Sequence, residues 1–488
     1  CHVILINNQS MRKHVAARRC KKIYFLQARE LMAIKLRFAS PDVALYAPRS
    51  PRYTPPVALS LYDTLTQQKR PFETQERGHA RIYVCGPTVY DYSHIDSDPL
   101  KELISDLGLS ITTMGGNSVF LNGKRYSTLE DVADGLGQEV RNGWQRFHNA
   151  AQDSISPREF YASDNSELVT AACPADQFVI PPRFDSLQAQ ITPSALHTFL
   201  ATMIHSDLAA EWSQTDVTYG LQNYLMNHPR YMQLYSIAGG NEQLIHRLAE
   251  STPMQLKLEH QVLSVERLSD GQMRLQIRHQ QQIHAEDFDY VVLCLPIQHL
   301  HSLTFPAPAL AAAMQRHLQQ FDHPAHYLRV TLLFRQPFWK TWLTDSWCML
   351  DAWGGCCLYD ETSRQPDPEC GILGWLFGGD AAVELSSLTD EQLIRTALDT
   401  LPASHQLAQE LLLEGHIHRW INAVSALPGG EQPTRLDLRH QPDPADHPRL
   451  FVTGDYLFDS TLNGVLDSAE CVASWIVAEL ENRPLPNR

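Results

Sequence analysis

The residues best placed to do chemistry lie near the C-terminus, in Arg449-Leu-Phe-Val-Thr-Gly-Asp-Tyr456 and Ser460-Thr-Leu-Asn-Gly-Val-Leu-Asp-Ser-Ala469. A short apolar strand that ends in Gly454-Asp455 lets the backbone pass close to a ligand and offers one carboxylate. The helix expected from Thr461 presents unpaired N–H groups and the positive end of its dipole. These groups predict a cradle for a polar or anionic ligand, although an ordinary strand, turn and capped helix explains the same residues equally well.

The elements that must position this cradle follow from the hydrophobic pattern. From Asp98 onward, helical and strand patterns alternate, which predicts an α/β fold. Ser118–Tyr126 is typical of a hairpin around an Asn-Gly turn. The expected helices are 100–109, 194–210, 241–249, 389–401 and 463–480, and the expected strands are 255–268, 272–279, 290–296, 328–334 and 450–453.

Five further segments precede the cradle in a fixed order. They are Tyr235-Ser-Ile-Ala-Gly-Gly-Asn-Glu-Gln-Leu244, His260-Gln-Val-Leu-Ser-Val265, Asp289-Tyr-Val-Val-Leu-Cys-Leu-Pro296, Arg329-Val-Thr-Leu-Leu-Phe-Arg-Gln-Pro-Phe-Trp339 and Arg419-Trp420. With the cradle they resemble, in order, the flavin-containing amine oxidases and their phytoene-desaturase-like relatives. The resemblance implies a Rossmann-like FAD-binding fold of the amine-oxidase type with a mixed-sheet substrate domain.

The resemblance also implies roles for single residues. FAD is the cofactor, and hydride passes to it from a C–H bond next to nitrogen, or from an analogous C–H bond, of a small-molecule substrate. Arg329 takes the place of a lysine that holds a water against the flavin, and Trp420 is either a wall of the substrate cage or a core aromatic. The expected cofactor-binding residues are Val262 at the adenine, Gly454 and Asp455 near the ribityl–phosphate region, and Thr461, Leu462 and Asn463 facing the isoalloxazine.

One part of that family's pattern is absent from the sequence. An amine oxidase should begin with strand, Gly-x-Gly-x-x-Gly and helix, and the glycine cluster Met114-Gly-Gly-Asn117 has the wrong spacing for it. We therefore expect the first βαβ unit to be missing. No metal site is expected either, because the chemistry needs none and no cysteine pair has metal-ligand spacing.

A different resemblance occupies the place of that unit. Leu59–Glu73 and Arg81–Ile95, which includes Tyr83-Val-Cys-Gly86, are similar to the opening of cysteinyl-tRNA synthetases. The ATP-binding signature of that family stops after His94-Ile95, and Cys85 lacks the family's other zinc ligands. The chain is therefore expected to comprise a basic, unstructured leader (1–58), a partial synthetase-like segment (59–97) and an amine-oxidase-like domain (98–488).

Composition and charge indicate which classes of ligand and which cellular location to expect. Residues 1–58 hold 11 Lys and Arg against 2 Asp and Glu, and the rest holds 29 against 53, so the acidic body argues against nucleic acid as the main ligand. Ten cysteines without a CxxC pair favour a reducing, cytoplasmic location, and no apolar run is long enough to span a membrane. The alternatives left open are a fragment of a cysteine–tRNA ligase and an inactive fusion product, and the oligomeric state is undetermined.

Overall fold

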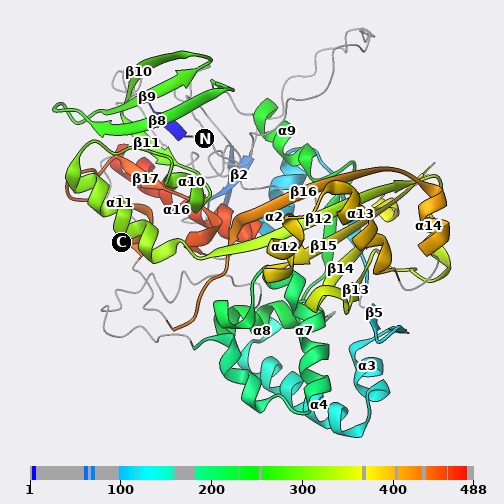
Figure 1. Cartoon of the computed structure of the whole chain (residues 1–488). Coiled ribbons are helices and arrows are strands. Elements are labelled where there is room, and N and C mark those ends of the chain that lie inside the picture. The colour runs from blue at the N-terminus through cyan, green and yellow to red at the C-terminus, as the bar shows by residue number, and fades with distance from the viewer. Residues whose placement is uncertain are drawn as a thin grey trace.

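The computed structural model describes residues 3–6, 60–63, 68–71 and 98–480, except 117, 158–159, 161–181, 229, 252–254, 365–369, 402–404, 431–435 and 459 (Figure 1). Most of the leader expected over 1–58, and the signature residues Cys85 and His94-Ile95, lie outside the described residues. Within the described part of the N-terminal segment are strand β1 (Val3–Ile6) and a hairpin of β2 (Ser60–Asp63) and β3 (Gln68–Pro71).

A small sheet with the order β1-β11-β17 forms the centre of one half of the molecule. Strand β11 (Tyr290–Leu293) pairs in parallel with β17 (Leu450–Val452) and antiparallel with β1. Every residue of β11 is buried, as expected for a strand that is covered on both faces. The parallel pair agrees with the α/β class expected from the sequence.

An antiparallel meander and five helices cover this sheet. The meander consists of β8 (His260–Arg267), β9 (Met273–His279) and β10 (Gln282–Phe288). The helices bury one continuous apolar core with the sheet, and they are α2 (Asp98–Asp106), α9 (Glu242–Ser251), α10 (Ile297–Leu300), α11 (Pro308–Phe321) and α16 (Leu462–Leu480). A separate two-stranded pair joins β4 (Ile111–Met114) to β7 (Leu234–Ile237).

The other half is built on a seven-stranded mixed sheet in the order β16-β12-β15-β14-β13-β5-β6. Its strands are β5 (Ser118–Leu121), β6 (Lys124–Tyr126), β12 (Pro324–Phe334), β13 (Trp347–Leu350), β14 (Cys356–Asp360), β15 (Gly371–Gly378) and β16 (Leu412–Ser425). Parallel pairing of β13 with β5 makes the sheet mixed.

Helices pack on both faces of this sheet (Figure 1). On one face lie α3 (Leu129–Gly135), α4 (Gln138–Ser154), α7 (Ser194–Leu208) and α8 (Val217–Leu225). On the other lie α12 (Gly379–Ser386), α13 (Asp390–Asp399) and α14 (His405–Leu411). The remaining short helix is α15 (Leu436–His440). The 3₁₀ helices are η2 (Phe184–Gln190), η3 (Trp212–Gln214), η4 (Phe338–Thr341), η5 (Ala352–Gly354), η6 (Glu361–Arg364) and η7 (Asp455–Leu457), which follows β17.

Local backbone conformation explains where the expected elements begin and end. The hairpin of β5 and β6 is confirmed: Asn122 and Gly123 have φ values of 52° and 74°, the left-handed pair that a two-residue loop requires. Helix α7 stops at Leu208 because Ala209 is left-handed, with φ 56°. Strand β8 begins at His260, later than expected, after Glu259 with φ 61°.

None of the helices in the described residues is long and apolar enough to cross a membrane.

The side chain of His205 ties α7 to the elements around it. Its Nε2 lies 2.8 Å from Glu211 Oε1 and its Nδ1 3.3 Å from the carbonyl oxygen of Gly355. Both partners are hydrogen-bond acceptors, so the doubly protonated, cationic imidazole is the form that satisfies both contacts. The N–H of Asp380 donates to the same Glu211 oxygen, over 3.0 Å. One ionic contact thus connects α7, η3, η5 and α12.

Burial lowers the pKa of His205, but the hydrogen bond and charge of Glu211 outweigh burial and raise that pKa above its ordinary 6.5. The hydrogen bond from His205 lowers the pKa of Glu211 below 4.5. Protonated His205 therefore stabilises the fold fully below pH 6.5, and this stabilisation is lost as the pH rises through the raised pKa of His205. Ionised Glu211 stabilises the fold fully above pH 4.5, and this stabilisation is lost as the pH falls through the lowered pKa of Glu211.

We expect Glu211→Gln to lower the free energy of unfolding by about 1.5–3 kcal/mol in the mildly acidic range, because it removes a charge-assisted hydrogen bond. The difference from wild type should shrink at alkaline pH, where His205 loses its proton. Urea denaturation of the full chain at about pH 5.5 and about pH 9 measures both values. Glu250→Gln, at an exposed pair with Arg247, is the matched control and should have little effect. A Glu211→Gln penalty that is the same at both pH values would contradict this account.

Candidate functional site

The ends of β11 and β17 are locked together at the predicted cradle. The N–H of Thr453 donates to the carbonyl oxygen of Leu293 (3.0 Å), and its hydroxyl donates to Cys294 Sγ (3.1 Å). The N–H of Gly454 then donates to Ser468 Oγ in α16, over 3.0 Å. A Cβ atom at Gly454 would lie 2.4 Å from the ring of Tyr456, so close packing requires glycine here.

The residues expected to face the flavin gather at the N-terminus of α16. Thr461 Oγ1 accepts hydrogen bonds from the N–H groups of Asn463 (3.1 Å) and Gly464 (3.3 Å). Asp455 accepts one from Ser460 Oγ, over 3.4 Å. The structure therefore brings Asp455, Thr461 and Asn463 together, while the side chain of Leu462 is buried in the core. The Thr461 hydroxyl caps part of the helix end that a ligand would otherwise occupy.

Arg329 and Trp420 lie on one face of the seven-stranded sheet. In the pairing of β12 with β16, Tyr327 is opposite Trp420 and Arg329 is opposite His418. Opposite residues, and residues two apart on one strand, share a face, so all four side chains point the same way. Trp420 is partly exposed and stacks on His418 with ring centroids 5.5 Å apart. This face turns towards α7.

The charge of Arg329 is engaged within the protein. Its side chain is 0% exposed, and a terminal nitrogen lies 2.8 Å from Glu361 Oε1. Its Nε donates to Thr331 Oγ1 (3.2 Å), and its guanidinium lies 5.5 Å from the ring centroid of Tyr359. Sequence reasoning missed Glu361 and Tyr359, because no local pattern connects residues on β14 and η6 with one on β12. This arrangement accounts for Arg329 structurally and leaves its expected role towards a bound water a proposal.

The start of α16 is attached to the same sheet. The N–H of Ser425, at the end of β16, donates to Ser460 Oγ over 3.1 Å. Ser460 directly precedes Thr461, and Ser425 lies five residues beyond Trp420. The predicted flavin end and the predicted cage aromatic therefore belong to one connected region.

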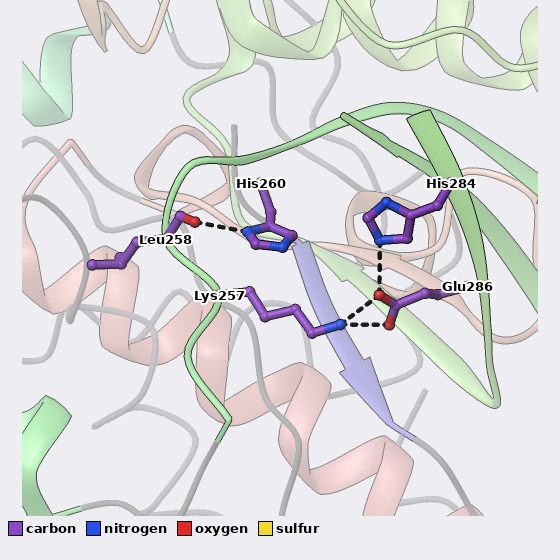
Figure 2. Close-up of polar contacts among 5 residues, drawn as sticks. All are labelled: Lys257, Leu258, His260, His284 and Glu286. Atoms are coloured by element: carbon purple, nitrogen blue, oxygen red, sulfur yellow. Dashed lines mark hydrogen bonds and ion pairs between the residues drawn. The ribbon is translucent and has the colours of Figure 1, made fainter. Parts of the chain in front are cut away.

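The expected adenine contact lies on the meander. Val262 in β8 is 3% exposed, pairs with Ile277 of β9, and packs in the apolar core. Before β8, the ammonium group of Lys257 contacts both oxygens of Glu286 in β10, at 2.5 and 2.7 Å, and His284 Nε2 lies 3.1 Å from Glu286 Oε1 (Figure 2). This polar cluster fixes the entry to β8.

The described residues fit one end of FAD better than the other. Gly454, Asp455 and the α16 N-terminus offer a carboxylate and a close backbone approach at the flavin end. A doubly wound dinucleotide fold binds pyrophosphate at a glycine-rich turn between its first strand and a helix N-terminus. Strand β11 pairs in parallel with β17 on one edge, and the strand at its other edge, β1, runs antiparallel. In the described part of the chain no glycine-rich turn and helix N-terminus stand at that edge, and no group of three or more His, Cys, Asp or Glu could hold a metal ion.

Among curated proteins, the chain is 32% identical over 120 residues to a cysteine–tRNA ligase of Treponema pallidum, a match that covers 23% of this chain and 22% of the ligase. The chain thus spans about a fifth of the length of this relative. The finding supports the synthetase-like resemblance over part of the chain.

Solved structures with a similar fold include amine oxidases. Cyclohexylamine oxidase from Brevibacterium oxydans matches with a TM-score of 0.58 at 17% identity, over 80% of this chain and 87% of that one. Wild-type putrescine oxidase bound to putrescine matches with a TM-score of 0.55 at 15% identity, over 79% and 87%. These likenesses confirm the expected fold. The family model of flavin-containing amine oxidoreductases matches residues 83–477, and the chain therefore belongs to that family.

Proposed function

We propose that the chain is an FAD-dependent oxidoreductase of the amine-oxidase type, which takes hydride from a C–H bond next to nitrogen or from an analogous C–H bond. Membership of the family over residues 83–477 carries this proposal. The joined region of Asp455, the α16 N-terminus and the Arg329–Trp420 face supports it, because a hydrogen bond connects the expected cofactor end with the expected substrate face.

The roles that we propose for single residues are those that the family resemblance implies. Asp455, Thr461 and Asn463 bind and orient the flavin end, Gly454 admits the cofactor backbone closely, and Val262 lies along the adenine wall. Trp420 orients the substrate, and Arg329, whose guanidinium is ion-paired with Glu361 on the same face, takes the place of the lysine that holds a water against the flavin. When bound, FAD supplies the electron chemistry. Leu462 contributes through packing of the helix start.

The organisation of the chain limits how tightly it can bind FAD. We infer that residues 98–488 form the oxidoreductase domain, that 59–97 are a partial synthetase-like segment behind a basic leader, and that the pyrophosphate-binding unit is lost. The six cysteines among the described residues form no disulfide, which supports a cytoplasmic protein. A fragment of a cysteine–tRNA ligase, or an inactive fusion, is the alternative that the match to the Treponema ligase favours.

We expect the purified chain to carry well under one FAD per chain. Loss of several charge-assisted hydrogen bonds to pyrophosphate, at about 1.5–3 kcal/mol each, weakens binding by several orders of magnitude. The visible absorption spectrum and the flavin released on denaturation measure occupancy. A full equivalent of bound flavin would show that other residues rebuild the phosphate site.

Replacing residues 1–97 by the first βαβ unit of a family member should restore flavin binding. In that restored protein, Asp455→Ala should weaken FAD binding by about tenfold or more, because it removes the carboxylate at the flavin end. Asp446→Ala, at an exposed carboxylate outside the cradle, serves as the control and should leave FAD affinity unchanged. Equal FAD affinity in the Asp455→Ala and control proteins would remove Asp455 from the site.

We expect no adenylate formation by this chain. The ATP-binding signature breaks off after His94-Ile95, so the histidine that would stabilise the pentacovalent phosphate is absent from the sequence. Cysteine-dependent exchange of pyrophosphate into ATP should stay at background, with an intact cysteinyl-tRNA synthetase as the positive control. Exchange clearly above background would favour the ligase alternative.

A further inference from the structure

Strand β16 is the outermost strand of the seven-stranded sheet (Figure 1). It pairs with β12 along one edge, and no strand in the described part of the chain pairs with its other edge. None of the residues 412–423 is buried, whereas every residue of the inner strands β13 and β14 is buried. An edge strand of this length presents a row of backbone N–H and C=O groups on which another strand can pair.

Apolar side chains are exposed on and beside this edge strand. Leu413 on β16 is 44% exposed, and Leu407 on α14, the helix that leads into β16, is 40% exposed. Val383 on α12, which packs against β16, is 41% exposed. Eight large apolar side chains are exposed among the described residues, so three of the eight lie on β16 and its two neighbouring helices. Clustering of exposed apolar side chains is typical of a contact surface.

The regular part of β16 is symmetric about Ile417. Its pairing with β12 is continuous from Glu414 to Trp420, and the register shifts directly beyond each of these two residues. When two copies of this segment pair antiparallel about a two-fold axis at Ile417, that residue lies opposite itself and Glu414 lies opposite Trp420. A two-fold axis perpendicular to the sheet keeps each side chain on the same face in both copies. The two sheets then become one continuous sheet.

On the face beneath α13, the side chains complement one another in this register. Ile417, which packs against the core there, meets Ile417 of the second copy, so the apolar core continues across the junction. Gly415 lies opposite Arg419, so a residue without a side chain faces one with a long side chain. The charge of Arg419 is already paired with Asp390 over 2.8 Å, so this contact brings no unpaired charge to the junction.

On the other face, the same register forms one row of rings and carboxylates. His416 lies opposite His418, and each His418 is stacked on Trp420 of its own chain with ring centroids 5.5 Å apart. Glu414, which contacts His416 over 2.9 Å, lies diagonally across from His418 of the second copy, within reach of an attractive contact. Groups of like charge do not face one another here while the histidines are neutral. A second copy of β16 is therefore a partner that matches both faces.

We propose that β16 is a dimer interface, on which a second copy of this chain pairs antiparallel through residues 414–420 with the two-fold axis at Ile417. This inference concerns assembly and goes beyond the proposed function, because its test needs no bound flavin. One consequence does rest on the proposed function: Glu414 of the second copy lies beside Trp420, on the proposed substrate face.

Sedimentation equilibrium of the full chain at about 1–100 µM measures its mass in solution. Wild type should approach twice the mass of one chain. His416→Lys/His418→Lys sets ammonium groups opposite each other at both His416–His418 contacts and should weaken dimerisation about 100-fold or more. Both positions are exposed, so the fold should persist. The matched control is His246→Lys/Gln315→Lys, at exposed positions on α9 and α11, which should leave the mass unchanged.

A charge exchange tests the register itself. His416→Glu/His418→Glu should not dimerise alone, but an equimolar mixture with the lysine variant should form a heterodimer, because each carboxylate then lies opposite an ammonium group. A wild type that stays monomeric, a lysine variant that dimerises like wild type, or a mixture that does not associate would overturn the proposal. Slow hydrogen exchange of the β16 amides in a monomeric wild type would overturn it in favour of another segment of the same chain on this edge.

Discussion

The pairing of β12 with β16 is the constraint on which the rest of the structure depends. The pairs extend from Pro324 and Ser425 at one end to Phe334 and Leu412 at the other. Leu328, Val330, Leu332 and Phe334 alternate along β12 into the core beneath α13, so Tyr327, Arg329 and Thr331 must face α7. At one end the ladder meets the end of α7 through Ala209, Ala325 and Val424, and it meets α16 through Ser425. A shift of one residue would turn Arg329 and Trp420 to the opposite face.

Much of the fold could be predicted because local signals agree with tertiary packing. The Asn-Gly loop of β5 and β6 and the capping box at Thr389, which opens α13, specify their elements without distant contacts. Strand β16 could not be found in this way. Glu414, His416 and His418 give it a polar face, and its apolar positions do not alternate strongly. Its extended form comes from the partner strand β12, although Trp420 could be singled out by family resemblance.

In the candidate site, too, residues that are close in sequence could be predicted, whereas residues brought together by distant strands could not. Asp455, Thr461 and Asn463 were within reach of sequence reasoning because one turn carries all three. Thr461 proved to cap the helix as well, which is the ordinary explanation that the sequence left open. Glu361 and Tyr359 were out of reach, because they become partners of Arg329 only when β12, β15 and β14 assemble.

The direction of β1 bears on the cofactor end of the site. In the register with β11, Val3 is opposite Leu293 and Ile6 is opposite Tyr290. The C-terminal end of β1 therefore lies at the start of β11, at the opposite end of the sheet from Gly454. In a doubly wound sheet the phosphate-binding turn follows a parallel strand, so that turn, ligand and neighbouring strand ends meet at one edge. An antiparallel strand can satisfy the hydrogen bonds of β11 and still supply no turn beside the carboxylate of Asp455.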